Sequence, residues 1–149
     1  MPDKGDQVVW KWAGQITAKS DYGNPVTTDE YTLCLYDAGN LVASATADAG
    51  GTCGTKPCWA EKPTSFTYKD KESTPTGTQS ISLKEGLVAG KAKITFKGKG
   101  GPLVMPTLDS FTGPVAVRLH RSGGATCWGA DFSAPFLKQD GTQLKDKSD

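Results

Sequence analysis

Hydrophobic and polar residues alternate along most of this chain with a period of two. The clearest stretch is GKAKITFKGKG, where Ala92, Ile94 and Phe96 share one side and Lys91, Lys93, Thr95, Lys97 and Lys99 the other. Such alternation is typical of strands that are buried on one face. The other residues that it directs toward a core are Val8, Trp10, Trp12, Tyr31, Leu33, Leu35, Leu41, Ala43, Ala45, Ile81, Leu83, Val115, Val117, Leu119, Trp128, Ala130 and Phe132.

Turn-forming residues separate these segments, and no segment keeps helical apolar spacing over three turns. About eight or nine strands with turns every 8–12 residues predict an all-β fold. We expect two antiparallel sheets packed as a sandwich, jelly-roll or immunoglobulin-like, with a final short strand near the C-terminus. Residues 1–6 are polar and predicted to be flexible, and residues 7–149 are predicted to form a single domain.

The four cysteines offer three kinds of chemistry. Cys53 and Cys58 enclose four residues, which does not match the C-x-x-C of redox enzymes, and no helix is predicted after the first sulfur. A zinc site needs four close ligands, whereas Cys34 and Cys127 are isolated in the sequence. We therefore favour disulfides and, of the three possible pairings, predict Cys53–Cys58 and Cys34–Cys127. Disulfides persist in oxidising compartments, so we expect a secreted or cell-surface protein.

Charge and composition argue against several partners. The net charge is +1, and Arg118 and Arg121 are the only arginines, so we expect no nucleic acid partner. No run of 18 apolar residues is present, so we expect no membrane insertion. The first seven residues, MPDKGDQ, lack the apolar core of a signal peptide, and we expect that such a peptide preceded Met1. The lysines of residues 91–99 are interpreted as protection against pairing at a sheet edge.

Several blocks of this sequence resemble those of a known domain family. They are WKW, YTLCLYD, GTCG followed by KPCW, FTYKDK, GKAKITFKGKG, CWGADFS and KDK. Together they resemble an uncharacterised cysteine-containing β-rich domain of exported proteins from myxobacteria and related bacteria. The resemblance covers nearly the whole chain and implies export and a modular architecture. It implies no activity.

Aromatic and acidic residues supply the candidate binding sites. Exposed aromatic rings stack on sugars, and Trp59, which lies in the cysteine loop, is the main candidate, together with Tyr22 and Tyr36. Asp21, Asp29 and Asp37 lie in turn-rich segments and are weak candidates for calcium, which prefers oxygen ligands. No other cofactor is expected. The competing interpretation is that these acids only form turns.

The sequence gives no clear catalytic motif. His120 is the only histidine, and a serine triad would need it together with Asp131 or Asp109, but no G-x-S-x-G occurs. We interpret His120 as a surface or packing residue. We expect a non-catalytic, exported binding or adhesion module for a glycan or surface polymer. The alternatives are a structural domain that self-assembles through strand edges and a hydrolase with paired carboxylates.

Overall fold

Two antiparallel sheets make up the body of the protein in a computed structural model. The structure describes residues 7–14, 16–72, 77–88, 91–99, 112–123, 127–132, 138–139 and 144–145. The first sheet has the order β1 (Gln7–Gly14), β9 (Ala92–Lys99), β8 (Thr78–Lys84), β7 (Ser65–Lys69), β6 (Trp59–Lys62). The second has the order β11 (Cys127–Phe132), β10 (Val115–Arg121), β2 (Tyr31–Asp37), β3 (Asn40–Ala47). These nine strands confirm the predicted sandwich.

Short elements complete the described chain. They are a 3₁₀ turn, η1 (Lys19–Tyr22), and four two-residue strands, β4 (Thr52–Cys53), β5 (Lys56–Pro57), β12 (Lys138–Gln139) and β13 (Leu144–Lys145). The pair β12–β13 agrees with the short strand predicted near the C-terminus. No helix in the described residues is long and apolar enough to span a membrane. Residues 1–6, predicted to be flexible, lie outside the described residues.

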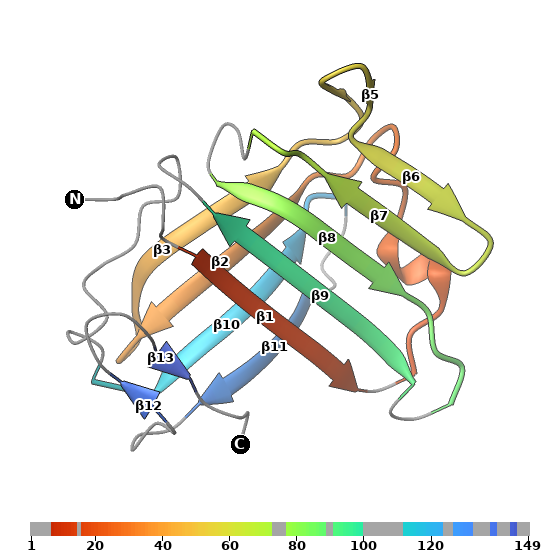
Figure 1. Ribbon diagram of the computed structural model, residues 1–149. Coiled ribbons are helices and arrows are strands. Elements are labelled where there is room, and N and C mark those ends of the chain that lie inside the picture. The colour runs from red at the N-terminus through yellow and green to blue at the C-terminus, as the bar shows by residue number, and fades with distance from the viewer. Residues whose placement is uncertain are drawn as a thin grey trace.

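The strand order follows the order of the sequence closely. Strands β6 to β9 form a meander, and β2–β3 and β10–β11 are hairpins. This order differs from the ABED and CFG sheets of immunoglobulin constant domains. Figure 1 shows the strands of one sheet running across those of the other, so the sheets pack crosswise over a shared core.

The alternation seen in the sequence fills the space between the sheets. Buried residues from both sheets form one core, comprising Trp10, Tyr22, Tyr31, Leu33, Ala45, Ala47, Trp59, Phe66, Tyr68, Ile81, Leu83, Ile94, Phe96, Val115, Val117, Leu119 and Trp128. Nearly every position predicted to point inward does so. Leu41 was predicted to point inward but is 57% exposed. A register shift pairs Leu41 with Tyr36 and so turns it to the outer face.

Candidate functional site

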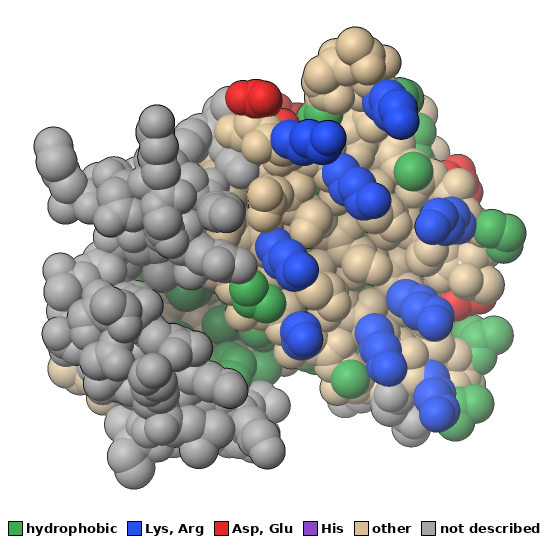
Figure 2. All heavy atoms as spheres, viewed as in Figure 1, with side chains coloured by type: hydrophobic (Ala, Val, Ile, Leu, Met, Phe, Trp, Pro, Cys, Tyr) green, Lys and Arg blue, Asp and Glu red, His purple; other side chains and the backbone are tan. Residues whose placement is uncertain are grey.

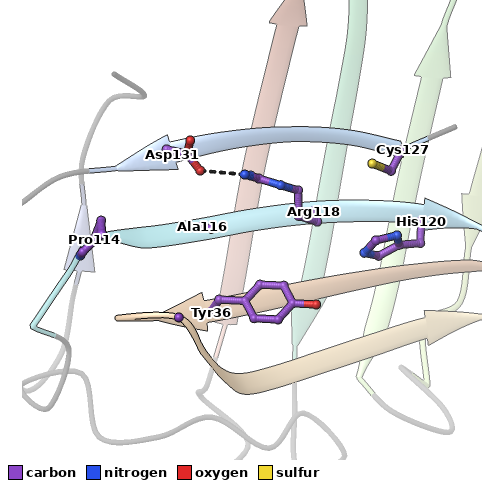
Figure 3. A pocket seen from close by; sticks show the side chains of 8 residues that line it. Tyr36, Pro114, Ala116, Arg118, His120, Cys127 and Asp131 are labelled. Carbon is purple, nitrogen blue, oxygen red and sulfur yellow. Dashed lines mark hydrogen bonds and ion pairs between the residues drawn. The ribbon is translucent and has the colours of Figure 1, made fainter.

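An open groove lies on the outer face of the second sheet, the face turned away from the core. It encloses about 650 Å³ and is lined by Tyr36, Gly39, Pro114, Ala116, Arg118, His120, Cys127 and Asp131. Strand alternation produces this set, because Ala116, Arg118 and His120 occupy every second position of β10. Cross-strand pairing then sets Tyr36 and Asp131 on either side of Ala116. Figure 3 shows these side chains gathered over the three strands.

Three hydrogen bonds hold the guanidinium of Arg118 in place. Its Nη1 donates to the carbonyls of Val117 at 2.9 Å and Ala130 at 3.1 Å, and its Nη2 donates to Oδ1 of Asp131 at 2.9 Å. Gly129 lies opposite on β11, and a Cβ there would come within 2.5 Å of the Arg118 Cδ. The arginine therefore lies across β11 only because position 129 has no side chain. Its side chain is 33% exposed and keeps donors free for a ligand.

Tyr36 is the aromatic residue of the groove. It is partly exposed, and its ring lies over β2 with the hydroxyl directed along the strand (Figure 3). Cys34 lies two residues away on the same face of β2. Burial raises the pKa of the Cys34 thiol, and that thiol is the main reason that the pKa of Tyr36 is also raised. Tyr36 therefore offers a neutral ring and a hydroxyl to whatever enters the groove.

His120 and Cys127 lie directly opposite each other on β10 and β11, and both are exposed. A smaller hollow of about 480 Å³ adjoins them, and Cys127 lines both depressions. The hollow also contains the partly buried Trp12 and a single acid, Asp21. The two depressions share Cys127, at the start of β11, but Trp12 belongs to the inward-facing side of β1 and packs against the core.

The sequence predicted Tyr36 but missed the groove around it. His120, interpreted from the sequence as a surface or packing residue, is exposed, and Asp131 was considered only as the partner of a catalytic histidine. In the structure Asp131 contacts Arg118 instead. The alternation VAVRLHR already places Arg118 and His120 on one outer face. The sequence did not give the order of the strands, which decides which side chains lie beside Arg118 and His120.

The predicted Cys53–Cys58 disulfide is present, with the Cα atoms 4.9 Å apart. The predicted Cys34–Cys127 disulfide is wrong, since both residues are free. Their strands lie on opposite sides of β10. Two strand spacings separate them by about 10 Å, whereas a disulfide needs Cα atoms within about 7 Å.

The prediction that Trp59 and Tyr22 bind a ligand is also wrong. Trp59 is 2% exposed and Tyr22 is fully buried. A chain of ring contacts runs through the core, joining Tyr22 to Trp128, Trp128 to Tyr31, Tyr31 to Trp59 and Trp59 to Tyr68, with centroids 5.1–6.1 Å apart. Large rings fill the space between the crossed sheets, and the polar atoms of Trp59 and Tyr22 are bonded to backbone carbonyls. The Trp59 Nε1 donates to the carbonyl of Asp48, and the Tyr22 hydroxyl donates to that of Lys84.

The three calcium candidates are not grouped into a metal site, and each accepts a hydrogen bond from the backbone. Asp21 accepts from the amide of Ala18, and Asp37 accepts from those of Thr112 and Gly113. Asp29 precedes β2, at the opposite end of that strand from Asp37, and is 5% exposed. It accepts a 2.6 Å bond from the amide of Asn24 and pairs with Arg121 at 3.4 Å. Among the described residues, no three histidines, cysteines or acids are grouped to hold a metal.

Comparison with known proteins adds no further constraint: no family model, curated protein or solved structure matches this chain. The resemblance to exported β-rich domains remains a prediction.

Proposed function

We propose that this protein is a non-catalytic, exported module that binds a glycan or a related surface polymer in the groove at Tyr36. The observation that carries the proposal is the grouping of a partly exposed ring with the fixed Arg118–Asp131 pair and the exposed His120. The C–H face of a sugar packs against an aromatic ring, while its hydroxyls need donors and acceptors close by. The groove is open to solvent, which suits a segment of polymer better than an enclosed small molecule.

Two further features support this proposal. The adjoining hollow, which shares Cys127 with the groove, contains the partly buried Trp12 as a further aromatic residue. The Cys53–Cys58 disulfide is compatible with an oxidising compartment, where surface polymers occur. The paired carboxylates that a glycosidase would use are not found in either depression, because each has one acid among its described residues, Asp131 or Asp21.

A glycan array followed by calorimetry tests the proposal. Tyr36→Phe keeps the ring and should bind nearly as well as the parent protein, whereas Tyr36→Ala should lose about tenfold or more in affinity, or about 1.4 kcal/mol. Leu87→Ala, 65% exposed and outside the residues that line the groove, is the matched control. The proposal is wrong if no uncharged glycan binds, or if Tyr36→Ala binds an uncharged glycan as well as Leu87→Ala does.

Self-assembly through strand edges remains the second candidate, and one observation favours it. Strand β1 has eight residues and pairs only with β9 among the described residues, which leaves its other edge available for strand addition. Light scattering over a range of concentrations tests this function. A Val9→Pro variant removes one backbone donor and should weaken any assembly through β1. A protein that stays monomeric at high concentration would reject it.

A further inference from the structure

The outer face of the first sheet carries lysine and hydroxyl side chains and no acidic residue among its described positions. Cross-strand pairing defines this lysine face. Its lysines are Lys11, Lys62, Lys69, Lys84, Lys93 and Lys97, all exposed. The positions between them are Val9, Ala13, Ala60, Ser65, Thr67, Ser80, Ser82 and Thr95. Figure 2 shows the basic side chains spread across the whole face, with acidic side chains only at its margin.

These lysines have no counter-charge within the described part of the chain. The ion pairs there join Lys19 to Glu61, Arg118 to Asp131 and Arg121 to Asp29, and none of them involves the lysine face. Lys93 and Lys84 are direct cross-strand partners. Like charges directly opposite each other destabilise a sheet, so the pairing of Lys84 with Lys93 is unfavourable for folding.

Protection of a sheet edge, the interpretation drawn from the sequence, does not explain this face. Strand β9 lies between β1 and β8, and β8 and β7 are likewise paired on both sides. Their lysines therefore guard no open edge; only Lys11 and Lys62 stand on edge strands. Four unpaired charges on interior strands indicate a surface adapted to an external anion.

We propose that the lysine face binds a linear anionic polysaccharide, carboxylated or sulfated. The sheet spans four strand intervals, about 19 Å, so several charges of one polymer can be contacted together. Serine and threonine hydroxyls between the lysines suit the hydroxyls of a sugar chain. This site lies on the sheet opposite the Tyr36 groove and is independent of the function proposed for that groove.

The composition of the face favours a polysaccharide over other polyanions. Nucleic acid sites combine positive charge with aromatic rings that stack on bases, and this face has no aromatic side chain among its described residues. It also has no arginine there, the residue best suited to the two-pronged recognition of phosphate. An anionic membrane would require apolar side chains that insert beside the charges, whereas Val9 at the margin is the largest apolar residue on the face.

Binding of polygalacturonate and dextran sulfate, with neutral dextran as the uncharged control, tests the proposal. Both anionic polymers should bind at low salt, and the affinity should fall steeply as salt is added. A Lys84→Gln/Lys93→Gln variant should bind about tenfold or more weakly and show a shallower salt dependence. Its melting temperature should not fall, because the substitution removes a repulsive pair.

Single substitutions provide matched controls. Lys93→Gln and Lys56→Gln change the net charge equally, but Lys56 lies on β5, which pairs with β4 and is not part of the first sheet. Only Lys93→Gln should weaken binding, and Tyr36→Ala should leave the binding of both anionic polymers unchanged. The proposal is overturned if neither polymer binds, if Lys56→Gln weakens binding as much as Lys93→Gln, or if duplex DNA or anionic vesicles bind more tightly than both polymers.

Discussion

Replacement of Trp59 by alanine should destabilise the protein rather than abolish a binding site. The indole is 2% exposed, contacts the rings of Tyr31 and Tyr68, and donates a 3.0 Å hydrogen bond to the carbonyl of Asp48. Tryptophan-to-alanine substitutions in a core cost about 3–5 kcal/mol. Two aromatic contacts and a lost hydrogen bond place this variant in the upper part of that range, at about 4–5 kcal/mol.

Urea unfolding, followed by circular dichroism, measures this loss. With a slope of about 2 kcal/mol per molar urea, the midpoint should fall by about 2 M. Trp59→Phe keeps a ring in the core but leaves the Asp48 carbonyl without its donor, so it should lose a smaller amount, about 1–3 kcal/mol. Trp59→Phe should also retain any binding that depends on Tyr36, because Trp59 does not line the groove.

Leu41→Ala is the control, since Leu41 is 57% exposed and its loss should change stability by no more than about 0.5 kcal/mol. The burial of Trp59 would be refuted if Trp59→Ala unfolded at the same urea concentration as Leu41→Ala. It would also be refuted if Trp59→Ala kept its stability and lost glycan binding, since both results indicate an exposed ring.

Two further predictions concern covalent and titrating groups. Removal of the Cys53–Cys58 disulfide by a double Cys→Ser substitution should cost about 2 kcal/mol of unfolding free energy, because the closed loop is short. Mass spectrometry should find the oxidised chain two hydrogens lighter than the reduced chain. A difference of four hydrogens would indicate a second disulfide, between Cys34 and Cys127. Burial raises the pKa of Tyr22, Tyr31 and Tyr68, the last to about 12, above the ordinary value near 10. Their stabilising contribution is complete below pH 10 and is lost as the pH rises through 10–12, so unfolding and tyrosinate absorbance should appear together. Tyrosinate formation by these residues in a chain that stays folded at pH 10–11 would contradict their burial.

The architecture was predictable because alternation is a local property. A strand that is buried on one face must place apolar residues at every second position. Strands β9 and β10 and the second half of β8 do so, at Ile81, Leu83, Ile94, Phe96, Val115, Val117 and Leu119. The β2–β3 turn was also predictable from the local sequence, because residues 37–40 favour a tight turn. In the structure Ala38 and Gly39 adopt the positive φ values of such a hairpin turn.

The binding residues were predicted less well because burial and neighbours depend on distant parts of the chain. Tyr22 lies in a segment rich in turn residues, which suggests exposure, but its hydroxyl reaches Lys84, 62 positions away, and its ring packs on Trp128. The Cys34–Cys127 pairing failed because strand order decides which residues lie side by side. Strand β10 lies between β2 and β11 in the sheet and so separates the two thiols.

The net charge of the whole chain likewise does not reveal the local charge of one face. The chain has 17 basic and 16 acidic residues, a balance that argues against any strong field. Six of the basic residues stand on the lysine face, so the remaining 11 basic and 16 acidic residues leave the rest of the chain at −5. Electrostatic attraction acts over about 8–10 Å at physiological salt, a distance shorter than the width of the sheet. A polyanion close to the lysine face therefore responds mainly to the local excess of positive charge, and the near-neutral total does not argue against such a ligand.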